Sequence, residues 1–309
     1  MSIRPTEALC HDSCKVRAGV YSLLVALLLL LTPLARAQDD PALLETVRAV
    51  EERLDARLGM LVRDTGDGRS VQYRAAERFP MTSTFKTLAC AALLQRVDQG
   101  SEDLARRVVF EEHELVSYSP ISSQHVGPPG MSLGELCAAT LAVSDNSAAN
   151  FILDALGGPE ALTAFLRSSG DQHSRLDRRE TALNEAVPGD LRDTTTPAAM
   201  ADTLERLLLS DLLSLTSRRQ LWHWLEANEV ADSLFRASLP NGWRIADRSG
   251  AGGYGSRSLT AVILPPEREP VIVTVYLTES GVEMPARDTA IAEIGAAVMQ
   301  WIMKSRPEE

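Results

Sequence analysis

The sequence is poor in lysine and in positive charge. Its 309 residues include 31 lysines and arginines against 42 aspartates and glutamates, which gives a formal net charge of −11. Only three of the basic residues are lysines: Lys15, Lys86 and Lys304. A chain this acidic has no basic surface with which to neutralise the phosphates of a nucleic acid, so we expect no nucleic-acid partner.

Two arrangements common among hydrolases are also missing from the sequence. Its one Gly-x-Ser-x-Gly segment, residues 130–134, follows no predicted strand and contains the Ser132 of a capping box, so it is not the elbow that exposes the nucleophile of esterases with a Ser-His-Asp triad. Its five histidines are scattered, whereas a metal hydrolase gathers histidine, cysteine and carboxylate ligands around its ion. We therefore expect neither an esterase of that type nor a metal centre, and no cofactor.

Long apolar runs are missing except near the N-terminus, at residues 20–31. Basic residues precede this run, and Ala35-Arg36-Ala37 follows it with small side chains where signal peptidase requires them. The run is short for a membrane span, and Pro33 further disfavours the alternative of a retained anchor. Residues 1–37 are thus predicted to be a cleaved secretory signal. This segment has four basic and two acidic residues, so its removal leaves a net charge of −13.

Cysteine is scarce, and two of the four cysteines, Cys10 and Cys14, lie in the predicted signal. Cys90 and Cys137 remain, an even pair in an oxidising compartment. A bridge between them would close a loop of about 48 residues and stabilise the fold by roughly 4 kcal/mol in the chain-entropy model. Spacing alone leaves open the alternative that both are separately buried thiols.

Strand patterns occur near both ends of the mature chain, and helical patterns fill its middle. Amphipathic helices are predicted over residues 41–57 and 288–304. Between 83 and 228 the pattern is mostly helical, with a capping box at Ser132-x-x-Glu135 and a cap at Thr196-Pro197. The glycine-rich residues 250–255 predict a hairpin turn between two strands. The predicted strands cover residues 60–63, 71–74, 244–248, 258–264 and 271–277.

These positions predict an α/β (α+β) fold, in which both ends of the chain form one antiparallel five-stranded sheet flanked by helices. An all-helical domain is inserted in the middle. The expected bounds are 38–75 and 225–309 for the sheet domain and 76–224 for the helical domain, with a cleft between them. The irregular stretch 175–193 is long for a loop in a compact domain, and such loops are usually functional or disordered.

Ser83-Thr84-Phe85-Lys86 is the first segment that could carry chemistry. A nucleophilic serine needs a neighbouring group that removes its proton. On a helix, Lys86 lies one turn after Ser83 on the same face, and a lysine in a desolvated site loses its charge, which an arginine does not. The helix N-terminus would also offer backbone N–H groups to a developing oxyanion. By itself Ser-x-x-Lys is equally the start of an ordinary capped helix.

Three further sets are weak when taken singly. Ser144-Asp145-Asn146 offers a hydroxyl and a carboxamide between two helices, but these residues also favour plain turns. Glu180 and Asn184 could hold and deprotonate a water, although a solvated loop acid is the commoner reading. Arg248-Ser249-Gly250 supplies a cation, a hydroxyl and a flexible backbone at the end of a predicted strand, where an extended anionic substrate could pair.

Together, in this order, the four sets resemble class A serine β-lactamases. The resemblance covers essentially the whole mature chain and implies the β-lactamase/penicillin-binding transpeptidase-like fold. The segments that carry it are 74–87 (RAAERFPMTSTFKT), Tyr118-Ser119-Pro120, 144–150 (SDNSAAN), 175–193 and 245–258.

The resemblance implies a catalytic role for four residues. Ser83 would be the nucleophile and Lys86 its partner, while Ser144 would pass a proton to the lactam nitrogen. Glu180, helped by Asn184, would hold and activate the water that hydrolyses the acyl-enzyme. Whether Lys86 or Glu180 starts acylation is disputed for this family.

It also implies a set of substrate-binding and structural residues. Asn146 would hold the side-chain amide of the substrate, the backbone N–H groups of Ser83 and Ala251 would form the oxyanion hole, and Tyr118 would line the cleft wall. The remaining implied residues are Arg248, Ser249, Gly250 and Arg257 around the substrate carboxylate, the Arg178–Asp193 salt bridge that pins the loop, and a Cys90–Cys137 disulfide.

One departure from the family pattern concerns Arg248, where the usual residue is lysine. The Arg-Ser-Gly form, preceded by Asp247, resembles the carbenicillin-hydrolysing subgroup. It implies a penicillinase that accepts carboxypenicillins and confers β-lactam resistance. We expect a secreted, bacterial periplasmic monomer that binds a small-molecule β-lactam and no membrane after signal cleavage.

Two other kinds of β-lactam-binding protein would share part of this pattern. A penicillin-binding D-Ala-D-Ala peptidase has the first three boxes, but its acyl-enzyme persists, and Glu180 with Asn184 argues against it. A β-lactam sensor domain usually carries a transmembrane segment, and the sequence has no second apolar span.

Overall fold

The computed structural model describes Met1 and residues 40–304. The predicted signal segment, with Cys10 and Cys14, lies outside the described residues apart from Met1. Among the helices of the described part, none combines the length and the apolar character that crossing a membrane requires.

A five-stranded antiparallel sheet forms the centre of the described chain, as predicted, in the order β2-β1-β9-β8-β7. Strands from the two ends of the chain meet in the middle, where β1 pairs with β9. The five strands are β1 (Arg57–Asp64), β2 (Ser70–Tyr73), β7 (Arg244–Ala251), β8 (Arg257–Leu264) and β9 (Val271–Thr278).

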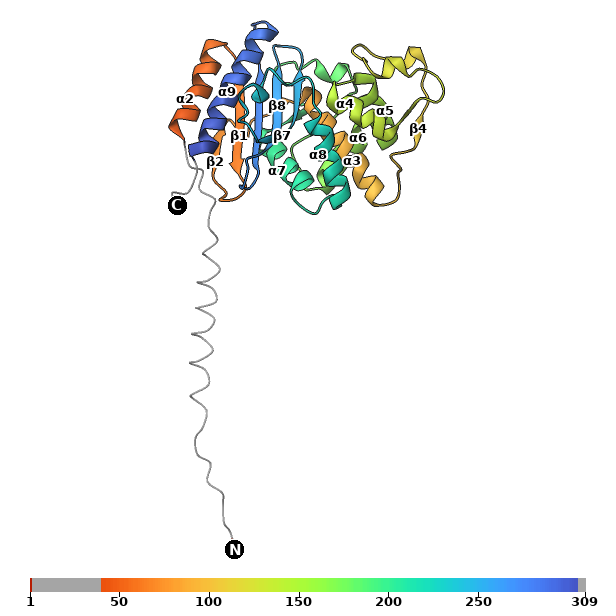
Figure 1. Ribbon diagram of the computed structural model, residues 1–309, viewed down its shortest axis with the longest axis horizontal. Helices are drawn as coiled ribbons and strands as arrows, with labels where there is room; N and C mark the ends of the chain where they lie inside the picture. Colours follow the sequence, from red (N-terminus) through yellow and green to blue (C-terminus); the bar gives the residue numbers. More distant parts are fainter. Residues whose placement is uncertain (2–39, 305–309) are drawn as a thin grey trace. The chain divides into compact units, whose positions relative to one another are not determined.

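The sheet is covered on both faces because its strands are apolar on both sides. In β1, Leu58, Met60 and Val62 join one buried cluster, and the intervening Leu61 joins another. The first cluster contains α2 (Pro41–Arg53) and α9 (Met284–Lys304), which lie side by side against the sheet (Figure 1). The first turn of α2 and the last turn of α9 line one small cavity together.

Helices of the middle segment pack on the other face of the sheet and beyond it (Figure 1). Central among them is α3 (Phe85–Asp98), whose residues 85–94 are all buried, as expected of a helix surrounded by protein. The others are α4 (Leu133–Ala142), α5 (Asn146–Leu156), α6 (Pro159–Ser168), α7 (Pro197–Leu208) and α8 (Leu215–Glu226).

Short elements complete the connections between these helices and the sheet. Two pairs of two-residue strands are present, β3 (Phe79–Pro80) with β6 (Thr194–Thr195), and β4 (Arg107–Val108) with β5 (Met131–Ser132). Single 3₁₀ turns lie at Thr82–Thr84, Glu112–Glu114, Ser122–Gln124, Ala182–Asn184 and Phe235–Ser238.

Both predicted helix caps are present. Ser132 and Glu135 form the capping box, with Ser132 Oγ accepting from Glu135 N and Glu135 Oε2 accepting from Ser132 N. Thr196 caps α7 through the N–H of Ala199, and Pro197 is the first residue of the helix.

The expected element bounds were wrong in places. The helix predicted to reach residue 57 ends at Arg53, because Asp55 turns the chain with φ of 43° and β1 begins at Arg57. The closing helix begins at Met284 rather than at 288. Most consequential, β7 continues through Ala251, so the Arg-Ser-Gly segment is paired with β8 instead of ending the strand.

The buried clusters do not follow the predicted domain bounds. One cluster runs without interruption from the sheet residues Ala246, Val262 and Ile272 into the middle helices. Residues 40–304 belong to a single compact unit. The division into 38–75 with 225–309 and 76–224 therefore stays a prediction about how the two parts are organised.

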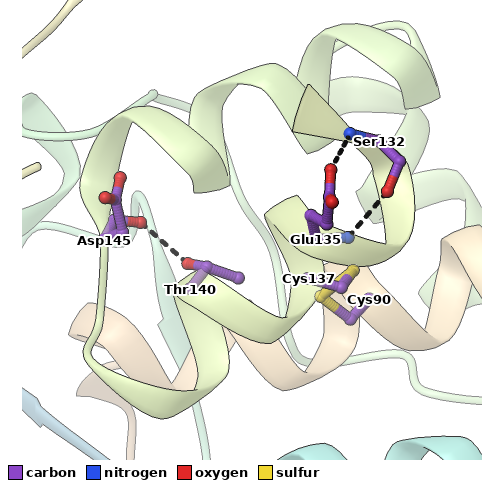
Figure 2. The surroundings of a disulfide bond; sticks show 6 residues. All are labelled: Cys90, Ser132, Glu135, Cys137, Thr140 and Asp145. Carbon is purple, nitrogen blue, oxygen red and sulfur yellow. Dashed lines mark hydrogen bonds between the residues drawn. A yellow bond between two sulfur atoms is a disulfide. The ribbon is translucent and has the colours of Figure 1, made fainter. Parts of the chain in front are cut away.

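A disulfide joins Cys90 of α3 to Cys137 of α4, with Cα atoms 5.8 Å apart and both side chains fully buried (Figure 2). Near the end of α4, the Thr140 hydroxyl donates to the carbonyl of Asp145 at 2.9 Å. The two links fix α3, α4 and the turn that contains Ser144 and Asp145 relative to one another.

Replacing both cysteines, Cys90→Ala with Cys137→Ala, is expected to lower the free energy of unfolding by roughly 4 kcal/mol, since the unfolded chain gains entropy when the link is lost. Chemical denaturation followed by circular dichroism measures the loss. The wild type in reducing agent is the matched control and should lose a similar amount. Unchanged midpoints in both would contradict a stabilising link.

Candidate active site

The four sequence sets converge on one cleft of about 400 Å³. It lies where the free edge of β7 meets the start of α3, the turn between α4 and α5, and the 175–193 loop. Its lining residues are Ser83, Tyr118, Ser144, Asn146, Asn184, Val230, Arg248, Ser249, Gly250, Ala251, Arg257 and Met284.

Ser83 lies in the 3₁₀ turn that leads directly into α3. The hydroxyls of Thr82 and Thr84 both donate to Met81 O at 2.7 Å, which fixes the turn. A Cβ on Gly250 would come within 2.1 Å of Thr82 Oγ1 and 2.9 Å of Ser83 N. Glycine at this position is therefore what allows the β7 backbone to pack directly against the amide of Ser83.

A chain of hydrogen bonds connects Ser83 with Lys86. Ser144 Oγ donates to Ser83 Oγ at 3.1 Å, and Lys86 Nζ donates to Ser144 Oγ at 3.0 Å. The ammonium also donates to Ser144 O at 2.9 Å and to Asn146 Oδ1 at 2.7 Å. The i,i+3 spacing places Lys86 on the same side of the helix as Ser83, but the hydrogen bonds connect Lys86 to Ser83 through Ser144.

Lys86 is fully buried and forms an ion pair with Glu180, with Nζ 3.0 Å from Oε1. Burial lowers the pKa of Lys86 to about 8, since a charged amine is costly where water is excluded. The carboxylate of Glu180 opposes this effect, and the cation of Arg248 adds to it. Both the charged and the neutral form of the amine are thus populated near neutral pH.

The 175–193 loop is held by its own charges. Arg178 Nε donates to Asp193 Oδ2 at 2.5 Å, and Asp193 Oδ1 accepts the N–H groups of Asp177 and Arg178 at 2.8 and 2.9 Å. Arg178 also pairs with Glu185 at 2.5 Å. These contacts bring Arg178 and Asp193 together and close the base of the loop.

Asn150 holds the backbone of Glu180 beside the cleft, and the sequence analysis gave this asparagine no role. The Asn150 carboxamide donates to Glu180 O and accepts from Glu180 N, both at 2.9 Å. Asn184 Nδ2 donates to Glu180 Oε2 at 2.5 Å. Asn150 lies four residues after Asn146 on α5, and this i,i+4 spacing was the available signal.

Of the four buried side-chain oxygens without a hydrogen-bond partner in the described part of the chain, two belong to this pair: Glu180 Oε1, whose contact is the Lys86 ion pair, and Asn184 Oδ1. Buried acceptors are normally satisfied by protein or by ordered water. Asn184 lines the cleft and is hydrogen-bonded to Glu180, so the pair has the acceptors needed to bind a water molecule.

Three polar groups gather at the other end of the cleft. Arg248 is 1% exposed and donates to Leu141 O at 2.9 Å and Ser249 O at 3.0 Å. Burial lowers the pKa of Arg248 to about 10, so the guanidinium remains charged near neutral pH. Arg257 donates to Gly250 O at 3.2 Å and to Asp288 Oδ1 at 2.6 Å. Ser249 Oγ donates to Val230 O at 3.3 Å.

The cleft also contains residues that the sequence analysis missed. Val230 and Met284 line it, from the turn after α8 and from the start of α9. No local motif marks them, because they reach the cleft only through the tertiary fold. Tyr118, with φ of 62°, is 58% exposed at the rim. No group of three or more potential metal-ligating side chains occurs among the residues that the structure describes.

Comparison with known proteins gives a consistent result. Residues 42–302 match the model of the Beta-lactamase enzyme family. The chain is 46% identical over 289 residues to Beta-lactamase AER-1 of Aeromonas hydrophila, covering 93% of this chain and 95% of that protein.

Two solved structures are similar along most of the chain. One is an ancestral class A β-lactamase, 56% identical, with a TM-score of 0.82, covering 84% of this chain and 99% of the other. The second is the class A β-lactamase of the last common ancestor of Gram-negative bacteria, 54% identical, with a TM-score of 0.83 and the same two coverages.

The lysine scarcity makes the Lys86 pKa directly measurable. Residues 38–309 contain only Lys86 and Lys304, so ¹³C-lysine labelling gives two Cε signals, with Lys304 as the exposed reference. The Lys86 signal should titrate with a midpoint of about 8. In Glu180→Gln the midpoint should fall further, because the carboxylate that favours the ammonium is gone. A rise in that variant would contradict the assignment.

Proposed function

The chain belongs to the class A serine β-lactamases, and we propose that it hydrolyses the lactam amide of penicillins, including carbenicillin, through an acyl-enzyme on Ser83. The proposal assigns deacylation to a water molecule activated by Glu180. The observation that carries it is the continuous polar chain Ser83–Ser144–Lys86–Glu180 in one cleft.

In the acylation step, Ser83 Oγ attacks the lactam carbonyl and its proton leaves toward the Lys86–Glu180 pair. The lactam C–N bond then breaks, and the nitrogen takes a proton from Ser144 Oγ, which is replenished by Lys86. The short contacts of Ser144 with both partners support this route. The backbone N–H groups of Ser83 and Ala251 would hold the oxyanion, consistent with the close packing of the 3₁₀ turn on β7.

In the deacylation step, Glu180 would take a proton from a water that attacks the ester carbonyl, releasing the ring-opened product and restoring Ser83. Support comes from the buried, unpartnered Asn184 Oδ1 and the buried Glu180 Oε1. The same arrangement argues against the peptidase alternative, whose acyl-enzyme has no poised base. Asn146 would hold the substrate amide beside this water.

Arg248, Ser249 and Arg257 would bind the substrate carboxylate. Two guanidinium groups and a hydroxyl at one end of the cleft are suited to an anionic group. The planar fork of Arg248, in place of a lysine ammonium, is the basis for proposing a preference that includes carboxypenicillins.

The biological setting is part of the proposal. Cleavage of residues 1–37 would release a secreted, periplasmic monomer whose activity confers β-lactam resistance. The oxidised Cys90–Cys137 pair fits such a compartment.

Glu180→Gln is expected to trap an acyl-enzyme with benzylpenicillin, because removal of a general base slows deacylation by about 10²–10⁴-fold. Intact-mass spectrometry should show the added mass of the whole penicillin. Ser83→Ala is the matched control and should show no adduct while keeping the fold. Turnover by Glu180→Gln at the wild-type rate would exclude Glu180 as the base.

Arg248→Lys is expected to keep benzylpenicillin hydrolysis and to lower the relative kcat/KM for carbenicillin, because the ammonium cannot form a planar two-point contact. Steady-state kinetics with the two substrates measures the ratio. Equal loss with both substrates would refute the carbenicillin preference and limit Arg248 to the carboxylate that the two substrates share.

A further inference from the structure

We propose that Asn228 is a positioning residue for Arg248, and that Asp247 fixes the orientation of the Asn228 amide. The proposal rests on the assignment of Arg248 to the substrate carboxylate made above. Asn228 is 2% exposed and does not line the cleft, so its effect on the substrate passes through the arginine.

The Arg248 guanidinium is held by acceptors from three segments. Its Nε donates to the carbonyl of Ser249, and its Nη1 donates to Leu141 O at 2.9 Å and to Asn228 Oδ1 at 3.4 Å. Leu141 and Ser249 contribute main-chain carbonyls. Within residues 40–304, Asn228 contributes the one side-chain acceptor among the hydrogen bonds of this guanidinium, and it is therefore the contact that a substitution can remove.

The two ends of the Asn228 amide face different partners. Its Nδ2 donates to Asp247 O at 3.2 Å and to Asp247 Oδ1 at 3.1 Å. This leaves Oδ1 to accept from Val230 N at 3.2 Å and from Arg248. The reverse orientation would put an NH₂ group against a guanidinium, which has donors only. A hydrogen-bond acceptor at Asp247 thus selects the orientation that presents oxygen to Arg248.

Asp247 is itself held in place. Arg236 Nε and Nη2 donate to Asp247 Oδ1 at 3.1 and 2.7 Å, and the same guanidinium donates to Leu225 O and Glu226 O at the end of α8. The buried carboxylate forms an ion pair with Arg236. One oxygen, Oδ1, accepts both from Arg236 and from Asn228, so an asparagine at 247 keeps the required acceptor.

The turn that contains Asn228 also contacts the other parts of this end of the cleft. Val230 O accepts from the hydroxyl of Ser249, and Glu229 N donates to Ala142 O at 2.9 Å, at the end of α4. Residues 228–230 therefore connect β7 with the helix that leads into Ser144. Asn228 lies where these contacts meet.

The test uses benzylpenicillin and its methyl ester, which lacks the negative charge that Arg248 would bind. In Asn228→Leu, the KM for benzylpenicillin should rise about tenfold with little change in kcat, the effect of losing one hydrogen bond to a charged group. The kcat/KM for the methyl ester should stay within about twofold of the wild type. The preference, which is the ratio of kcat/KM for benzylpenicillin to that for its methyl ester, should thus fall about tenfold.

Matched variants separate positioning from general loss of structure. Asp247→Leu should lower the preference in part, since the carbonyl of residue 247 still accepts from Asn228, and Asp247→Asn should restore it by keeping the side-chain acceptor. Thr203→Val is the control: it removes a different buried hydrogen bond, from Thr203 of α7 to Asp171, and should leave the preference unchanged. An unchanged preference in Asn228→Leu or Asp247→Leu would overturn the proposal, as would an equal loss with the ester.

Arg248→Met distinguishes this proposal from the function on which it rests. This variant should lower the preference to the part that Ser249 and Arg257 provide, and adding Asn228→Leu to it should have no further effect on the preference. A preference that is unchanged in Arg248→Met would refute the assignment of Arg248 to the carboxylate. A preference lost in Arg248→Met but intact in Asn228→Leu would refute the positioning role alone.

Discussion

The architecture of the cleft depends on one ammonium group that has been taken out of water. A buried lysine is costly unless acceptors surround it, and Lys86 has four: two atoms of Ser144, the Asn146 carboxamide and the Glu180 carboxylate. These acceptors come from the α4–α5 turn, from α5 and from the long loop. The need to satisfy a single buried charge thus brings together the groups that the proposed chemistry requires, and the same burial brings the pKa of the amine close to neutral.

The remainder of the fold holds these segments at fixed positions. The sheet is closed in its middle by pairing the two ends of the chain, which leaves β7 as the edge strand beside the cleft. Gly250 allows that strand to approach the Ser83 turn, and Asn150 holds both backbone groups of Glu180. The disulfide links α3 to α4 within the same buried cluster. The cleft is therefore held both by close main-chain packing and by side-chain links that lie outside it.

Periodicity and short motifs predicted the fold class, the five strands and the helix caps, because strand alternation and cap chemistry depend on residues close together in the sequence. Cleft residues such as Tyr118 and Arg257 were expected only from the resemblance to class A β-lactamases. The extension of β7 through Ala251 was missed because glycine usually signals a turn, whereas here tertiary pairing with β8 outweighs it. Asn228, Asp247 and Val230 could not be grouped from the sequence, since their contacts cross from the turn after α8 to the edge strand.

The two ends of the continuous described segment lie close together, since Asp40 and Lys304 border the same small cavity. Met284, at the opposite end of α9, lines the cleft, and a helix of 21 residues separates the two sites by about 30 Å. Such adjacent ends suit circular permutation, in which a short linker joins the old ends and new ones are opened elsewhere. A second protein fused at either of these ends would likewise lie away from the cleft and leave it open to the substrate.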